Sequence, residues 1–123
     1  MSWIGTWRNQ YGSVVEITDD ADHKITGTFR TALQDSGFFG QEISISGVHQ
    51  GDCISFAGGG STPAGDAVVS YTGLLREGRM ETLWYAVADS VLTAPREGAP
   101  AELKKRNWWR AMATGADTFE RAP

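Results

Sequence analysis

The sequence has one cysteine, a modest number of basic residues and no long apolar run, and each scarcity excludes a class of protein. A single cysteine, Cys53, supplies neither an intrachain disulfide framework nor a four-cysteine zinc site, and its strand-like surroundings predict a small buried side chain. No apolar run approaches ~18 residues, so no membrane span is expected. The net charge is −4 and the basic residues cluster only at residues 104–106, so an extended surface for nucleic acid is not expected either.

The first seven residues also lack the basic segment and apolar stretch of a secretory signal peptide. The sequence therefore predicts no signal peptide, and two interpretations stay open: the protein remains inside the cell, or Met1 is an added start. The 123 residues fit one domain spanning residues 1–123, which is long enough to bury one hydrophobic core.

Helical periodicity is scarce, whereas 15 glycines are spread along the chain between short alternating segments. Alternating apolar and polar residues bounded by Gly, Asn and Asp predict short strands. Eight strands are expected, at residues 6–9, 13–18, 25–31, 43–48, 53–57, 67–75, 79–88 and 108–121, the last broken near Gly115. We expect loops at residues 34–41, 58–65 and 90–107, the last with at most a helical turn.

Short connections join the predicted strands, which indicates an antiparallel up-and-down meander. Closing this meander into a barrel removes its exposed edges, and a barrel of eight strands has room for one small ligand. Because side chains alternate between faces, one face of each strand points inward. The expected inward sets are Ser13, Val15 and Ile17; Ile25, Gly27, Phe29 and Thr31; Ala67, Val69, Tyr71 and Gly73; and Thr82, Trp84 and Ala86. The opposite face of residues 67–75 is partly apolar, which favours packing against another subunit.

Five tryptophans in one small domain is a high number. We expect Trp7 to pack in the core. For Trp84 and Trp109 two interpretations are open: packing at the barrel ends, or flat apolar walls around a ligand.

Four segments, in order, resemble the avidin and streptavidin family. Residues 5–13 match its opening motif G-T-W-x-N-x-x-G-S, and residues 26–32 are similar to its third strand. Residues 82–84 are similar to its seventh strand, and residues 109–119 to its last strand with the pair D-x-F in register. The resemblance implies an all-β, eight-stranded antiparallel barrel that binds biotin as a ligand, with no cofactor.

The resemblance also implies the residues that hold the ureido group of biotin. Asn9 and Ser13 correspond to donors to the ureido oxygen, while Thr31 and Asp117 correspond to acceptors of the two ureido N–H groups. Phe29 stands where the family has a third donor, a tyrosine. A buried urea needs one acceptor and two donors paired, so these residue types suit it.

The apolar walls and the ligand tail are implied in the same way. Trp84 corresponds to a wall residue, and Trp109 to a tryptophan that reaches into a neighbouring subunit, which implies a homotetramer. Phe38 and Phe39 fall in the loop that closes as a lid in the family, or else pack at the rim. Other positions depart from the family: Tyr71 replaces a tryptophan, Ala67 and Val69 replace hydroxyl residues, Ala86 lies beside them, and either Gly60 or Phe56 occupies the place of a further tryptophan.

These departures predict biotin binding that is weaker than in typical members, because each lost hydrogen bond in a buried site costs on the order of 1–3 kcal/mol. A different, less polar urea-like ligand is the alternative interpretation. An enzyme with Asp117 as general base is a third, although no catalytic nucleophile pattern and no metal-ligand spacing is present. The sequence thus predicts a non-catalytic binding protein.

Overall fold

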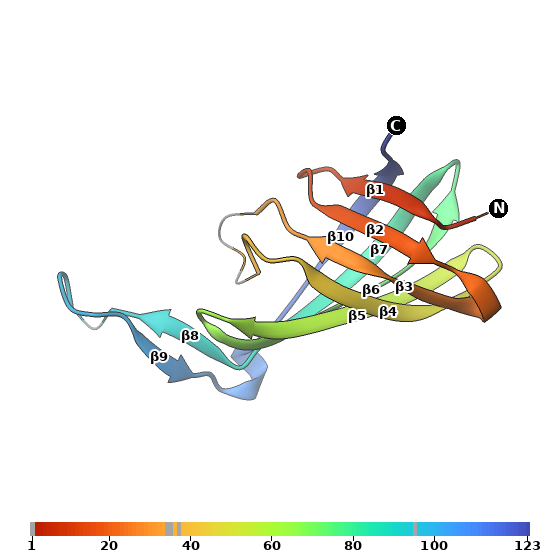
Figure 1. The fold of residues 1–123 in the computed structure, drawn as a ribbon. Helices are drawn as coiled ribbons and strands as arrows, with labels where there is room; N and C mark the ends of the chain where they lie inside the picture. Colours follow the sequence, from red (N-terminus) through yellow and green to blue (C-terminus); the bar gives the residue numbers. More distant parts are fainter. Residues whose placement is uncertain (1, 34–35, 37, 95) are drawn as a thin grey trace.

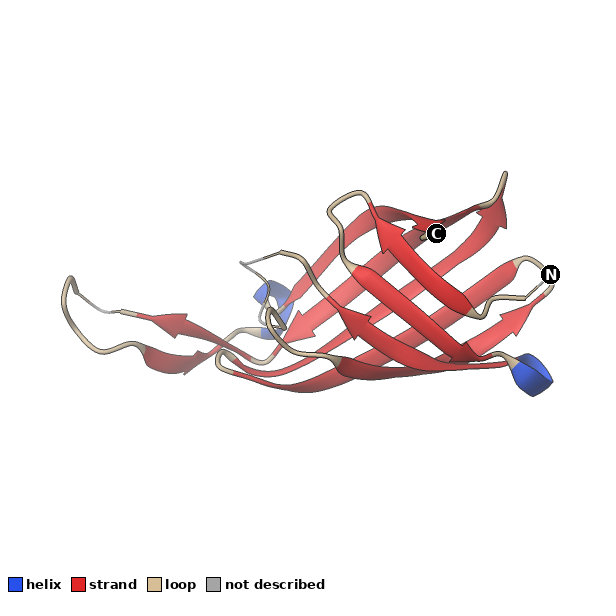
Figure 2. Ribbon diagram, turned by 45° about the horizontal axis from the view of Figure 1, so that its top comes forward, coloured by secondary structure: helices blue, strands red, loops and turns tan. Residues whose placement is uncertain are grey.

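A computed structural model describes residues 2–33, 36, 38–94 and 96–123. Positions 34, 35 and 37 of the predicted loop at 34–41, and residue 95 of the predicted loop at 90–107, lie outside the described residues. Strands dominate the described chain, and they curl around one another into a barrel (Figures 1 and 2).

The barrel is closed and follows the order β1-β10-β7-β6-β5-β4-β3-β2. Neighbouring strands run antiparallel, which confirms the predicted eight-stranded meander. Closure comes from β1 pairing with β10, so the first and last strands lie side by side. The barrel strands are β1 (Gly5–Asn9), β2 (Val14–Asp19), β3 (Lys24–Arg30), β4 (Ile43–Gln50), β5 (Cys53–Thr62), β6 (Gly65–Arg76), β7 (Arg79–Ala88) and β10 (Met112–Arg121). A short 3-10 turn, η1 (Ala21–His23), joins β2 to β3.

The glycine-rich segment at 58–65 is part of the barrel, so the prediction of a flexible loop was wrong. β5 continues to Thr62 and β6 starts at Gly65, and both remain paired throughout. Glycine is suited to this place because the neighbouring chain comes close: a Cβ on Gly58 would lie 2.5 Å from the carbonyl oxygen of Ser44. Because glycine has no side chain, residues 58–60 show no alternation of apolar and polar residues, although their backbone groups pair as in any strand.

Residues 90–107 also form more than a loop. β8 (Ser90–Thr93) pairs with β9 (Glu102–Lys105) as a two-stranded hairpin, which projects away from the barrel in Figure 1. A 3-10 turn, η2 (Trp108–Arg110), then leads into β10, so the predicted strand start at 108 was wrong. β10 runs through Gly115 without a break, contrary to the prediction.

The predicted alternation of faces is confirmed in the core. Val15, Ile17, Ile25 and Phe29 are buried inside the barrel, as expected. Cys53 is exposed, which corrects the prediction of a buried thiol. The reason is register: Ile54 points inward from β5, so its neighbour Cys53 points outward.

Tryptophans close one end of the barrel. Trp3 and Trp7 are fully buried, and the Trp7 indole N–H donates to the carbonyl oxygen of Trp3 at 2.9 Å. The Arg121 guanidinium lies 4.4 Å from the centre of the Trp7 ring. Trp7 is therefore a core residue, as predicted.

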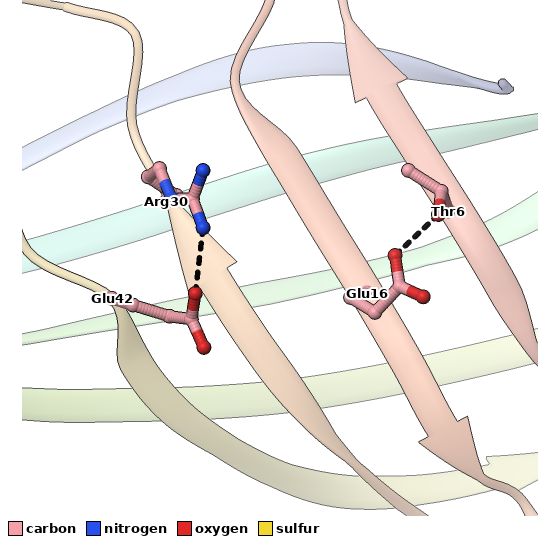
Figure 3. A network of polar contacts seen from close by, with 4 residues as sticks. All are labelled: Thr6, Glu16, Arg30 and Glu42. Atoms are coloured by element: carbon pink, nitrogen blue, oxygen red, sulfur yellow. Dashed lines mark hydrogen bonds and ion pairs between the residues drawn. The ribbon is translucent and has the colours of Figure 1, made fainter.

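Polar pairs on the outer surface tie neighbouring strands together. Figure 3 shows Thr6 of β1 donating to the carboxylate of Glu16 on β2. The same view shows the Arg30–Glu42 ion pair at 2.7 Å, which joins the two ends of the segment between β3 and β4. Both partners of this ion pair are more than half exposed, so its contribution to stability is small, about 0–1 kcal/mol.

Candidate ligand-binding site

Four polar side chains that the sequence predicted for one site are buried together at the end of the barrel opposite Trp3 and Trp7. Asn9 ends β1, Ser13 precedes β2, Thr31 follows β3, and Asp117 lies in β10. All the described buried side-chain nitrogen and oxygen atoms have hydrogen-bond partners, so the cluster is internally satisfied.

The turn between β1 and β2 fixes the position of Asn9. Its Oδ1 accepts the backbone N–H groups of Tyr11 at 3.0 Å and Ser13 at 2.9 Å. Gly12 has φ of +89°, which favours glycine, and its N–H donates to the Asn9 carbonyl oxygen at 3.0 Å. With Oδ1 engaged in the turn, the Nδ2 group of Asn9 points to the barrel interior as a donor.

The Asp117 carboxylate is the centre of the polar cluster. Its Oδ2 accepts from Asn9 Nδ2 at 3.0 Å and from the Tyr71 hydroxyl at 3.3 Å. Its Oδ1 accepts from Gln10 Nε2 at 3.1 Å. Burial, followed by the nearby Asp117 charge, raises the pKa of Tyr71 well above its usual value, so this hydroxyl stays protonated and can donate.

The contribution of Gln10 was missed by the sequence prediction. Gln10 Oε1 accepts the backbone N–H of Thr118 at 3.0 Å while its Nε2 binds the Asp117 carboxylate. Gln10 lies in the connection between the predicted strands at 6–9 and 13–18, so the alternation of strand faces said nothing about its side chain. Only its position next to Asn9 in the opening motif gave a signal.

The two hydroxyl residues of the cluster face one another across β2 and β3. Ser13 Oγ and Thr31 Oγ1 are 3.4 Å apart. Ser13 Oγ accepts the N–H of Ala32 at 2.9 Å, and Thr31 Oγ1 accepts that of Leu33 at 3.1 Å. Because one hydroxyl donates to the other, the pair as a whole keeps one proton to donate and one lone pair with which to accept.

Aromatic rings form the floor beneath these polar groups. Phe29 lies 5.8 Å from Tyr71 between ring centres, Phe56 stacks on Tyr71 at 5.4 Å, and Phe119 meets it edge-on at 5.4 Å. Of the two alternatives for the fifth strand, Phe56 is the side chain inside the barrel. Gly60 is exposed, and a Cβ there would meet only Ile43, at 3.9 Å.

The predicted wall residues come from β6 and β7. Val69 is buried, while Ala67, Trp84 and Ala86 are partly buried and pack against the core. The Trp84 indole lies across Gly115 of β10, where a Cβ would approach its ring to 2.6 Å. The Trp84 indole can therefore occupy this position only because Gly115 has no side chain.

The remaining aromatic candidates behave differently. Phe38 is buried and belongs to the core cluster, whereas Phe39 is about half exposed. Trp109 is 60 % exposed and packs edge-on against Trp108 at 6.1 Å between ring centres. Trp109 therefore contributes no wall to the site of its own chain.

Two surface cavities lie apart from the polar cluster. One, of about 610 Å³, is lined on its apolar side by Val68, Val87, Trp108 and Met112. The other, of about 640 Å³, lies along β9 and η2 beside Trp109. Neither is lined by Asn9 or Asp117, although the first includes Ala67, one of the predicted wall residues.

Among residues 2–33, 36, 38–94 and 96–123, no group of three or more His, Cys, Asp or Glu side chains is arranged to hold a metal ion. In the same described ranges, no helix has the length and hydropathy needed to cross a membrane.

A closed antiparallel barrel with a buried polar cluster at one end, aromatic rings beneath it and a tryptophan beside it defines a small-molecule-binding β-barrel. The sequence model of the Avidin family matches residues 1–122, and the chain belongs to that family. This confirms the resemblance seen in the sequence, and it confirms the expectation of a binding protein, since avidin-family proteins are non-catalytic.

Solved structures show the same fold at low sequence identity. The bradavidin2–biotin complex matches with a TM-score of 0.73 and 17 % identity, covering 100 % of both chains. The rhizavidin–biotin complex matches with a TM-score of 0.72 and 20 % identity over 99 % of this chain and 93 % of that one. Core-bradavidin matches with 0.69 and 27 % identity over 95 % and 97 %. None of the curated protein sequences matches the chain.

Proposed function

We propose that this protein binds biotin at the end of the barrel where Asn9, Ser13, Thr31 and Asp117 meet. The observation that carries the proposal is the buried polar cluster itself. It combines an amide donor, two hydroxyls and a carboxylate within one network that spans β1, β2, β3 and β10. A cyclic urea offers one acceptor and two donors, and this set can pair all three.

Binding exchanges contacts within the cluster for contacts to the ligand. Asn9 Nδ2 turns from Asp117 to the ureido oxygen, and Asp117 accepts a ureido N–H in its place. Ser13 donates its proton to the same ureido oxygen, and Thr31 accepts the second N–H. Trp84 forms a flat wall beside the ring, with Val69, Ala67 and Ala86 near the tail.

We propose that the affinity is lower than that of family members with a full set of polar contacts. Phe29 has no hydroxyl, and Ala67 and Val69 have none to offer the rest of the ligand. The highest non-covalent affinities correspond to about −18 to −21 kcal/mol, so the loss of a few kcal/mol still leaves measurable binding. The alternative is a less polar urea-like ligand in the same place.

The test is a biotin titration followed by calorimetry and by melting temperature. A ligand that binds only the folded state raises the melting temperature by mass action, so a rise at micromolar biotin is expected. Asp117→Asn should weaken binding about tenfold or more, because it removes a charge-assisted hydrogen bond. The matched control is Asp52→Asn, which should leave biotin binding unchanged. Asp52 is exposed, and its 3.8 Å ion pair with Arg76 lies at the protein surface.

No heat and no melting shift at millimolar biotin would contradict the proposal. Bulkier and more apolar cyclic ureas would then be titrated in the same way. Equal binding by the Asp117→Asn variant and wild type would instead remove Asp117 from the site.

We also propose that the chain forms a homotetramer. Exposed apolar side chains continue across the outer faces of three strands, where Val68 of β6 pairs with Val87 of β7, which pairs with Met112 of β10. Leu83, also on β7, is 58 % exposed. A two-fold contact between copies of this face would cover it and form a dimer, and the 60 % exposed Trp109 supplies a second surface through which two dimers could join.

Light scattering tests the assembly. We expect a mass of four times the 13.3 kDa of one chain, and a lower mass for Leu83→Lys. Ser44→Lys, which also introduces a lysine but on the exposed outer face of β4, should leave the mass unchanged. A monomer mass for wild type at micromolar concentration would contradict the tetramer while leaving the biotin test intact.

A further inference from the structure

Tyr71 is assigned to the apolar walls by its place in the sequence, yet its hydroxyl reaches the polar centre of the site. The hydroxyl oxygen lies 3.3 Å from Asp117 Oδ2, the same oxygen that Asn9 Nδ2 contacts at 3.0 Å. Tyr71 is only 5 % exposed, so this contact lies inside the barrel. It comes from β6, a strand that supplied no polar residue to the predicted ureido set.

The surrounding rings hold Tyr71 in this orientation. Phe56 stacks on one side and Phe119 meets it edge-on, both at 5.4 Å between ring centres. Phe29, the residue that lacks the expected hydroxyl, lies 5.8 Å from Tyr71. One hydroxyl is thus absent on β3 while another enters the same cluster from β6.

The contact between Tyr71 and Asp117 is suited to exchange for a ligand. At 3.3 Å it is longer than the usual 2.7–2.8 Å of an O–H···O bond, so little is lost when the hydroxyl turns away. A urea carries its carbonyl oxygen and its N–H groups on adjacent atoms of one plane. A ureido N–H bound to Asp117 therefore brings the carbonyl oxygen within reach of both donors that now contact Oδ2.

We propose that the Tyr71 hydroxyl donates to the carbonyl oxygen of the bound cyclic urea, in place of the hydroxyl that Phe29 lacks. This inference rests on the proposed function and adds a specificity residue to it. It makes the site selective for a ligand with a hydrogen-bond acceptor at that position. Burial and the Asp117 charge keep the hydroxyl protonated, which is the state that a donor requires.

The experiment compares biotin binding to wild type, Tyr71→Phe and the double variant Phe29→Tyr/Tyr71→Phe. We expect Tyr71→Phe to raise the Kd about tenfold to a hundredfold, because a donor to a buried ligand oxygen is lost. The double variant should recover most of that loss, since it returns a hydroxyl from the opposite strand. Tyr11→Phe is the matched control: it keeps the backbone N–H that donates to Asn9 Oδ1 and removes only the hydroxyl of a side chain that is 57 % exposed, so the Kd should be unchanged.

A second probe separates hydrogen bonding from packing. The cyclic guanidine analogue of biotin, in its protonated form, has an N–H group where biotin has the carbonyl oxygen. Tyr71→Phe should therefore weaken binding of biotin much more than binding of this analogue. The melting temperatures of the ligand-free variants show whether each one is folded.

Three results would each overturn the inference while leaving the proposed function intact. The first is wild-type biotin affinity in Tyr71→Phe, and the second is no recovery in the double variant although it melts like wild type. Equal losses for biotin and for the guanidine analogue would also overturn it, because they would indicate a packing role. If wild type itself does not bind biotin, the proposed function fails, and this inference fails with it.

Discussion

Replacing Gly115 by alanine tests how the barrel positions the Trp84 wall. A Cβ at residue 115 would lie 2.6 Å from Trp84 Cζ2, 2.7 Å from Cε2 and 2.8 Å from Nε1. Carbon atoms in contact are about 3.5–4.0 Å apart, so the rigid indole has to move by roughly 1 Å. Gly115 and Trp84 are directly paired across β10 and β7. The atoms that the new Cβ would overlap belong to the rigid indole ring and not to the end of a flexible side chain, so the whole ring must move.

The expected cost follows from this overlap. Inserting a methyl group into a packed site typically costs about 1–3 kcal/mol. At about 4 °C per kcal/mol for a domain near this size, the melting temperature should fall by about 4–12 °C. Biotin affinity should fall as well, because the wall is displaced from the ring that it is proposed to cover.

The assay is thermal unfolding of Gly115→Ala beside Gly60→Ala, the same change at a strand position with open space. A Cβ on Gly60 would meet only Ile43, at 3.9 Å, so this control should melt at or slightly above the wild-type temperature. In a Trp84→Ala background, Gly115→Ala should lose its cost, since the overlapping ring is gone. A Gly115→Ala protein that melts like the Gly60→Ala control would refute the reasoning.

Two further predictions concern the two ends of the barrel. Ser13→Ala removes the 2.9 Å acceptor of the Ala32 N–H in a partly buried contact, so the free energy of unfolding should fall by about 0.5–1.5 kcal/mol in urea denaturation. No change would show that water replaces the hydroxyl. At the other end, the backbone N–H of Trp3 lowers the pKa of Asp20 below 3.8. The folded pKa is below the unfolded value, so the stability from this contact is present above pH 3.8 and is lost as the pH falls through the lowered pKa. The melting temperature of wild type should therefore fall more steeply below pH 3.8 than that of Asp20→Asn, and parallel curves would contradict the assignment.

Local sequence signals predicted most of the barrel because strand alternation and turn residues are properties of neighbouring residues. Val15 and Ile17 are buried as the period of two requires, and the Asn9–Gly12 turn stands where its residue types indicated. The signals failed where side chains carry little information. The glycines at 58–60 show no alternation, and the charged segment at 102–105 gave no sign of a hairpin.

The sequence by itself determined that the chain is all-β, that each strand has an apolar inner face, and that it carries the motifs of the Avidin family. The family motifs predicted one site for Asn9, Ser13, Thr31 and Asp117, and only the tertiary structure showed that Tyr71 and Gln10 also contact the Asp117 carboxylate. Tyr71 and Asp117 are 46 residues apart, and Asn9 and Asp117 are 108 apart, so no local pattern links them. Their contact depends on the closure of the barrel between β1 and β10 and on the packing of Phe29, Phe56 and Phe119, which sets the direction of the Tyr71 hydroxyl.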